Sequence, residues 1–115
     1  MRFTATLKKN YEFHRLYRKG KTAATPFLVL YAKGSRRPGN RVGLTVSTKL
    51  GKAVKRNRVR RRLREIYRLN EQRIARGTDL VVVARGRAVT ATYRQLEAAF
   101  LSACRKLELL TETEA

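Results

Sequence analysis

The stretch from Gly51 to Arg68 constrains the fold most, because it is densely cationic and also periodic. On a helix with about 100° between residues, its apolar side chains fall in one sector. That sector collects Val59, Leu63, Ile66 and Ile74, with Tyr67 on its flank and Asn70 intruding. The opposite sector carries Asn57, Arg60, Arg61, Arg64 and Arg68. The sequence therefore predicts a helix that lasts until Arg76, where Gly77 stops it, and that exposes a guanidinium face.

An exposed face of this charge density favours an anionic partner over the usual solvated helix surface. Like charges four residues apart, such as Arg56 with Arg60, destabilise an isolated helix by roughly 0.2 to 0.5 kcal/mol a pair. Arginine also outnumbers lysine in the stretch. This favours phosphate, because a guanidinium group can donate two parallel hydrogen bonds to phosphate oxygens.

The whole chain shares this imbalance, with 28 Lys and Arg against 8 Asp and Glu and a net charge of +20. Its 115 residues suit a single domain covering 1–115. Such a charge strains the compact state unless a polyanion neutralises it, which makes nucleic acid the leading partner class. A membrane surface is less favoured, since the basic helix has an apolar sector suited to core packing and no Trp-rich insertion face.

Location and metal content follow from what the sequence does not contain. No apolar run approaches the roughly 20 residues that span a bilayer, and the first 21 residues lack the apolar stretch of a secretion signal, so we expect a cytoplasmic protein. Cys104 is alone in an apolar periodic segment and is expected in the core. His14 has no matching ligands, and the acidic residues are scattered, so protein metal ligands stay unknown.

The first part of the chain predicts a helix and two strands. Asn10 can cap a short aromatic-rich helix, and Gly20 suits a left-handed stop. Residues 27–32 are rich in strand formers, and Phe27, Val29 and Tyr31 are expected to share one face of that strand. Turn residues at 34–40 lead to a second strand at 41–47, in which apolar residues alternate with Gly43 and Thr45.

The last part predicts a central strand and a final helix. Residues 80–84 are continuously apolar and β-branched, as expected at the centre of a sheet. Thr92 and Gln95 form a capping-box pattern for a helix that continues toward Leu107, and the acidic end from Thr111 is expected to fray. Because the basic helix joins two strands, those strands can be parallel neighbours linked by a crossover.

Five segments spread over roughly residues 7–107 together resemble one known family. They are Leu7-Lys-Lys-Asn-x-x-Phe13 with Tyr17 and Gly20, Phe27-Leu-Val-Leu-Tyr31, Arg41-Val-Gly-Leu-Thr-Val-Ser47, Gly51-x-Ala-Val-x-Arg-Asn-Arg58 with Arg60, Arg61 and Arg64, and the late strand ending at Ala84-Arg85. Arg-Asn-Arg placed after Gly-x-Ala-Val and between two strands is specific. In these residues the chain is similar to the protein subunit of bacterial ribonuclease P.

The resemblance implies an α+β fold, an α/β sandwich of order αβββαβα with a small mixed sheet. Residues 21–23 would supply the extra short strand that this order requires. The family's basic helix lies in an unusual left-handed βαβ crossover. General rules make such crossovers right-handed in about 98% of cases, so this handedness rests on the resemblance alone.

The resemblance also implies an activity, that of an endoribonuclease acting as a ribonucleoprotein. This enzyme removes the 5′ leader from precursor transfer RNA by phosphodiester hydrolysis. The chemistry belongs to the catalytic RNA subunit and to Mg²⁺ ions held mainly by that RNA. We therefore expect no catalytic residue in the protein, and we expect the catalytic RNA and the precursor leader as its partners.

Two sets of site residues follow. The basic stretch is expected to bind the catalytic RNA through Lys52, Lys55, Arg56, Asn57, Arg58, Arg60, Arg61, Arg64 and Arg68. A cleft between the first helix and the sheet, lined by Phe13, Tyr17 and Tyr31, is expected to bind the leader. Tyr17 stands where the family commonly has Phe. The hydroxyl group of Tyr leaves the face of the ring available for stacking. The alternative that Phe13, Tyr17 and Tyr31 are all core residues stays open.

Other functions compete with this interpretation. A ribosomal-type or chaperone-like RNA-binding protein without enzymatic association would have the same composition. A protein-only nuclease would need clustered carboxylates or a pair of histidines, which the sequence lacks. DNA binding also fits the charge, because phosphate contacts are largely indifferent to sequence.

Overall fold

The protein is described by a computed structural model that places residues 1–111. The acidic end, which we expect to fray, lies outside the described residues beyond Thr111. Five strands form one sheet in the order β1-β4-β5-β3-β2. The strands are β1 (Thr4–Thr6), β2 (Lys21–Ala24), β3 (Leu28–Gly34), β4 (Asn40–Thr45) and β5 (Thr78–Ala84). The strand predicted at residues 80–84 therefore lies at the centre of the sheet.

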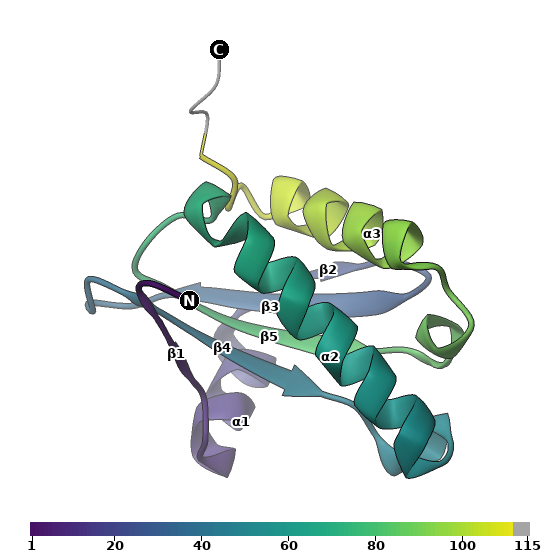
Figure 1. Cartoon of the computed structure of the whole chain (residues 1–115). Coiled ribbons are helices and arrows are strands. Elements are labelled where there is room, and N and C mark those ends of the chain that lie inside the picture. The colour runs from purple at the N-terminus through teal and green to yellow at the C-terminus, as the bar shows by residue number, and fades with distance from the viewer. Residues whose placement is uncertain (112–115) are drawn as a thin grey trace.

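The sheet is mixed, as predicted. β4 pairs in parallel with β1 and β5, whereas β3 pairs antiparallel with β5 and β2. α1 (Asn10–Lys19) lies on one face, and α2 (Ala53–Asn70) and α3 (Tyr93–Lys106) lie together on the other (Figure 1). α2 connects β4 to its parallel neighbour β5, which confirms the crossover. The left-handedness of this crossover stays a prediction.

The predicted order αβββαβα is confirmed from α1 to α3, and the expected short strand is β2. The sequence did not predict β1, which precedes α1. Glu71, the residue after α2, holds the segment that leads into β1. Its carboxylate accepts hydrogen bonds from the N–H groups of Arg2 at 2.8 Å and Phe3 at 3.1 Å. Short 3-10 helices at Thr48–Leu50, Glu71–Arg73 and Gly86–Val89 complete the connections.

Two hydrophobic clusters hold the layers together. The larger lies between the sheet and the α2–α3 layer and contains Val59, Leu63 and Ile66, the predicted apolar sector of the basic helix. Cys104 belongs to the same cluster, and burial raises the pKa of its thiol to about 12. The smaller cluster, beneath α1, is formed by the buried residues Leu7, Leu16 and Val81.

One predicted strand face is wrong. Phe27 packs against the larger cluster, whereas Tyr31 packs against the smaller one, so they do not share a face. Phe27 precedes β3 and belongs to a turn around Thr25. The Thr25 hydroxyl accepts hydrogen bonds from the N–H groups of Phe27 at 3.2 Å and Leu28 at 3.0 Å. The alternation of the strand therefore does not extend back to Phe27.

The predicted end of the basic helix is also wrong. α2 ends at Asn70, whose side chain donates to the carbonyl of Ile66 at 2.8 Å. Ile74 is buried as expected, but it is extended and pairs with Leu110. Gly77 does adopt a positive φ of 80°, but it does so in the turn before β5, seven residues after Asn70 ends the helix.

Predictions for the ends of the other helices were wrong at α1 and confirmed at α3. Gly20 has a φ of −81°, so it is no left-handed stop, and a Cβ there would lie 2.6 Å from the carbonyl oxygen of Leu16. Asn10 is the first residue of α1 and Lys9 holds the cap position, with its N–H donating to Glu12 at 3.2 Å. The capping box at α3 is confirmed, because Thr92 and Gln95 exchange hydrogen bonds.

No helix in residues 1–111 combines the length and apolar character needed to cross a bilayer.

Candidate nucleic-acid interface

The outer face of α2 presents the predicted cations to solvent. Its packing on Val59, Leu63 and Ile66 turns the opposite sector outward, as the periodicity requires. Of the residues expected to bind RNA, Arg56 and Arg60 are half-buried, and the others are exposed, namely Lys52, Lys55, Asn57, Arg58, Arg61, Arg64 and Arg68. The structure thus places all nine on one helix and its cap.

Among the described residues, almost all of this charge lacks a carboxylate partner. Arg68 donates to Glu65 through Nε at 3.0 Å and Nη2 at 2.7 Å, and this bond holds the pKa of Glu65 below its usual value. Within residues 1–111, no other predicted RNA-binding cation forms an ion pair. The face is therefore free to bind an anion everywhere except at Arg68.

Hydrogen bonds between residues close in sequence order the Arg-Asn-Arg turn of α2. Lys52 occupies the N-cap, and its carbonyl accepts from the N–H of Arg56 at 3.0 Å. Nε of Arg56 donates to the carbonyl of Gly51 at 3.0 Å, and Nη1 of Arg60 donates to Oδ1 of Asn57 at 3.2 Å. Asn57 thus orients a neighbouring guanidinium group.

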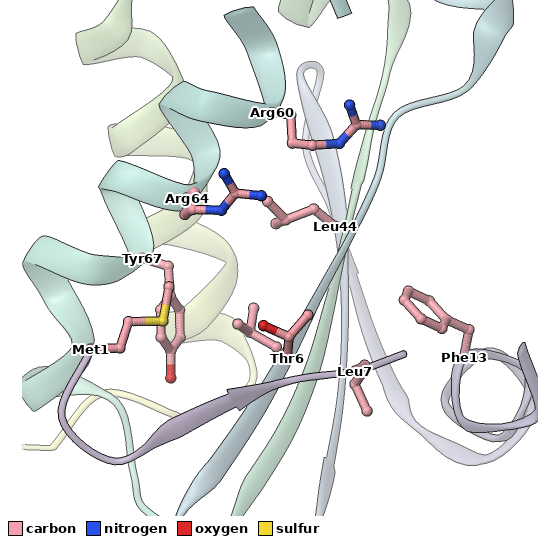
Figure 2. A pocket seen from close by; sticks show the side chains of 9 residues that line it. Met1, Thr6, Leu7, Phe13, Leu44, Arg60, Arg64 and Tyr67 are labelled. Carbon is pink, nitrogen blue, oxygen red and sulfur yellow. The ribbon is translucent and has the colours of Figure 1, made fainter. Parts of the chain in front are cut away.

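A pocket of about 150 Å³ joins the two predicted binding regions. Figure 2 shows Arg60 and Arg64 extending from α2 toward β4, which carries Leu44, with Phe13 of α1 on the far side of that strand. The remaining lining residues are Met1, Thr6, Leu7, Val42 and Tyr67. Members of the RNA set and the leader set, which were predicted separately, therefore line one pocket.

The edge of β4 explains why this pocket is open. β1 pairs with β4 only as far as Val42, so the strand from Gly43 to Thr45 has no partner on that side. A Cβ at Gly43 would lie 2.6 Å from two ring carbons of Phe13, so the glycine lets that ring pack against the strand. The open edge thus lies between cationic and aromatic side chains.

The three predicted leader residues gather on the α1 face of the sheet. The rings of Tyr17 and Tyr31 meet edge to face with centroids 5.0 Å apart, and the Tyr17 hydroxyl lies 3.0 Å from that of Thr45. Phe13, Tyr17 and Tyr31 are all half-buried and pack against the smaller cluster. They are neither fully enclosed core residues nor freely exposed.

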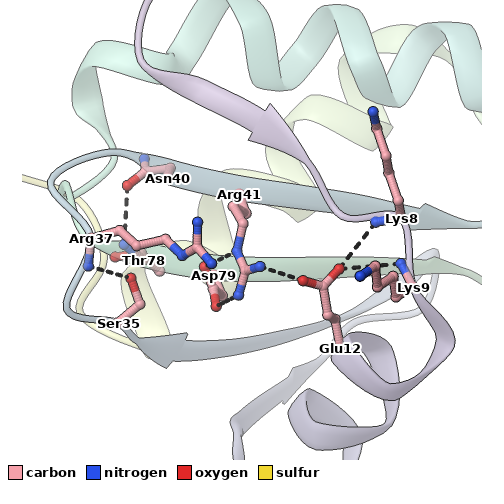
Figure 3. A network of polar contacts seen from close by, with 9 residues as sticks. All are labelled: Lys8, Lys9, Glu12, Ser35, Arg37, Asn40, Arg41, Thr78 and Asp79. Carbon is pink, nitrogen blue, oxygen red and sulfur yellow. Dashed lines mark hydrogen bonds and ion pairs between the residues drawn. The ribbon is translucent and has the colours of Figure 1, made fainter.

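An ion-pair network fixes α1 to the sheet (Figure 3). Arg41 of β4 donates to Asp79 of β5 through Nε at 3.2 Å and Nη2 at 2.7 Å, and through Nη1 to Glu12 of α1. The backbone N–H of Lys9 is the main cause that holds the pKa of Glu12 below its usual value, with Lys8 and Arg41 adding to it. This network sets the position of Phe13 and Tyr17 relative to β4.

Sequence reasoning missed several residues at this interface. Leu44, Thr6 and Leu7 line the pocket, and Thr45 bonds to Tyr17, yet none was predicted as a site residue. The alternation of β4 could have indicated Leu44 and Thr45. Nothing local could have indicated Thr6, because β1 was itself unrecognised.

No group of three or more His, Cys, Asp or Glu side chains in residues 1–111 is arranged to hold a metal ion.

Comparisons with known proteins agree with this geometry. The family model for ribonuclease P matches residues 1–108. A protein named ribonuclease P protein component from Alkaliphilus oremlandii is 42% identical over 104 residues, covering 90% of this chain and 91% of that one. The protein of the same name from Natranaerobius thermophilus is 44% identical over 105 residues, with 91% of each chain covered.

Solved structures give the same result. The Staphylococcus aureus RNase P protein superposes with a TM-score of 0.85 and 31% identity, covering 92% of this chain and 97% of that one. The protein from Thermotoga maritima gives a TM-score of 0.77 at 27% identity, covering 84% and 92%. Sequence and fold together show that this chain belongs to the ribonuclease P protein family.

Proposed function

We propose that this chain is the protein component of a ribonuclease P ribonucleoprotein and assists its catalytic RNA in removing the 5′ leader of precursor transfer RNA. The observation that carries the proposal is the face of α2, where cations on a helix packed against the core have no carboxylate partner within residues 1–111 except at Arg68. Guanidinium groups held in this way suit backbone phosphates. The catalytic RNA supplies them in this proposal.

The leader binds on the α1 face in the same proposal. Single strands are commonly held by bases stacked on aromatic rings beside a positive backbone track, at about 1 to 3 kcal/mol per stacked base. Phe13, Tyr17 and Tyr31 offer the rings, and Arg60 and Arg64 reach the same pocket as Phe13. A leader lying there would follow the open edge of β4 toward α2.

Magnesium ions in this proposal are held mainly by the RNA, where they would act as the Lewis acid in phosphodiester hydrolysis. The proposal assigns no catalytic residue to the protein. Its own contribution is positive charge, which reduces repulsion between the catalytic RNA and the precursor. The site of action is the cytoplasm.

The test replaces Arg60, Arg61 and Arg64 together by Ala and measures affinity for a bacterial catalytic RNA over a salt series. Each lost phosphate contact reduces the log-log salt slope by roughly 0.7 to 0.9, so the slope falls by about 2 to 3. A matched control replaces Arg94, Arg105 and Lys106 of α3, which are exposed and remove the same charge. A folded α2 variant whose slope equals that of this control contradicts the proposal.

A further inference from the structure

A second concentration of positive charge lies at the start of β4, on the opposite face of the sheet from α2. It surrounds a hollow of about 510 Å³ on the α1 face of the sheet. Its cations come from α1, the end of β3, the following turn and the start of β4. They are Arg15, Lys33, Arg36, Arg37 and Arg41, and the remaining lining residues are Gly34, Ser35 and Asp79.

The carboxylates near this hollow are already occupied. Arg41 binds both Asp79 and Glu12, and the three side chains are only 12 to 15% exposed. The four other cations are exposed, and no carboxylate within residues 1–111 forms an ion pair with any of them. Like charges gathered in this way repel one another, and a bound anion would reduce that repulsion.

The turn that carries Arg36 and Arg37 is fastened to the sheet. The N–H of Ser35 donates to the carbonyl of Gly77 at 2.7 Å, and the Ser35 hydroxyl accepts from the N–H of Arg37 at 3.1 Å. Gly77 has a φ of 80°, and a Cβ there would lie 3.2 Å from the Arg37 carbonyl. Figure 3 shows Arg37 beside Arg41 and Asp79. The backbone of these cations is therefore held in place before any ligand arrives.

The hollow is separate from the aromatic groove, the proposed leader site of Phe13, Tyr17 and Tyr31. Arg15 lies about 200° around α1 from Phe13, so the two residues project from opposite flanks of the helix. Phe13 and Tyr17 face the end of β4 that leads to α2, whereas Arg15 lines the hollow beside the turn. One RNA strand lying in the groove would have to cross α1 to reach the hollow.

We propose that this hollow is a second phosphate-binding site, occupied by the sugar–phosphate backbone of RNA. The inference rests on the proposed function and adds a contact that α2 and the groove do not provide. Cations from four elements, spread around a hollow larger than one phosphate group requires, suit successive phosphates of a backbone better than a single small anion. Guanidinium forks and a lysine ammonium group supply the hydrogen bonds.

The test replaces Lys33, Arg36 and Arg37 together by Ala. Affinity is measured over a salt series for a bacterial catalytic RNA, for precursor transfer RNA and for mature transfer RNA. The expected result is a loss of about 2 to 3 from the log-log slope with at least one of these RNAs. The triple Ala variant of Arg94, Arg105 and Lys106 loses the same charge from the opposite layer and is expected to lose clearly less.

The RNA that shows the loss identifies the source of the phosphate. A loss with the catalytic RNA assigns the hollow to that subunit, and a loss with both transfer RNAs assigns it to the body of the substrate. Slopes equal to those of the α3 control with all three RNAs overturn the proposal. Inorganic diphosphate, followed by NMR shifts of residues 33–37, would in that case show whether the hollow takes a small anion instead.

The α2 variant, tested in parallel, separates this inference from the proposed function. If the α2 variant loses slope and the hollow variant does not, the second site alone is wrong. If neither loses slope, the proposed function fails as well. Because the substituted side chains are exposed, the melting temperature should stay near that of the parent. Should it fall, the double variant of Arg36 and Arg37 replaces the triple, with an expected slope loss of about 1.4 to 1.8.

Discussion

Replacing Arg41 by Met tests how α1 is held on the sheet. The substitution keeps an unbranched side chain of similar length but removes the guanidinium group that binds Asp79 and Glu12. Breaking a buried ion pair by removing one partner costs about 3 to 5 kcal/mol. These side chains are still 12 to 15% exposed, so water screens part of that loss, and we expect about 2 to 3 kcal/mol.

The assay is thermal unfolding followed by circular dichroism. For a chain of this size, 1 kcal/mol corresponds to about 3 to 6 °C, so the melting temperature should fall by roughly 6 to 18 °C at neutral pH. Arg94→Met is the matched control, because Arg94 is exposed on α3 and has no ion pair within the described chain. It should melt within about 2 °C of the parent.

The pH dependence gives an independent check. The pKa of Glu12 is held below its usual 4.5 in the folded state, mainly by the N–H of Lys9 and also by Arg41. Such a carboxylate stabilises the fold above its unfolded pKa, and that contribution is lost as pH falls through the lower folded-state pKa. Without Arg41 the pKa is lowered less, so less stability is lost on acidification.

The difference in stability between parent and variant should therefore shrink below about pH 4.5. Adding Glu12→Gln to Arg41→Met should cost little, because Gln still accepts from the N–H of Lys9 and carries no unpaired charge. A melting temperature within about 3 °C of the parent at neutral pH, or a gap that is unchanged at acidic pH, would refute the reasoning.

Three further predictions concern the groove, one turn and the lone thiol. Tyr31→Ala should weaken binding of leader-bearing precursor by about tenfold and barely change binding of mature transfer RNA; equal losses for both RNAs would place that ring in the core. Tyr17→Phe should leave the binding of both RNAs nearly unchanged. Gly77→Ala should lower stability by about 1 to 2 kcal/mol in a chemical denaturation curve, because its φ is 80°, whereas Gly86→Ala, with open space around it, should not; equal stabilities would contradict this. Cys104, with its pKa raised to about 12 by burial, should not react with a thiol reagent at pH near 8 until the protein unfolds, and rapid labelling of the native protein would show that the site is open.

Local sequence patterns predicted most of the fold. The spacing of Val59, Leu63 and Ile66 predicted the buried side of α2, and Thr92 with Gln95 predicted the start of α3, because each depends on residues within one or two turns. Family resemblance supplied β2, whose four residues have no distinctive alternation.

Features that depend on contacts distant in sequence could not be predicted. β1 has three residues and is defined by β4 and by Glu71, which lies more than 60 residues away. Gly77 was expected to stop the basic helix, but the sequence could not distinguish a helix stop from the turn before β5, where this glycine has a φ of 80°. α2 ends at Asn70, and the next residue, Glu71, is buried and accepts hydrogen bonds from the N–H groups of Arg2 and Phe3.

The candidate site divides in the same way. Periodicity predicted the outward guanidinium face, and the structure bears out its exposure. The joining of Arg60, Arg64 and Phe13 in one pocket depends on how α1 and α2 meet the edge of β4, and no local pattern contains that information. The Arg41 network links residues 29 and 38 positions apart, so only the structure reveals that both carboxylates are already occupied.

The most direct test of the account is leader cleavage by a bacterial ribonuclease P RNA at limiting magnesium. Adding this protein is expected to restore rapid removal of the 5′ leader, because its charge replaces part of the counterion requirement. The triple Ala variant of Arg60, Arg61 and Arg64 is expected to restore it poorly. Cleavage that is equally slow with and without the protein, under conditions where the RNA alone is active at high magnesium, would contradict the central claim.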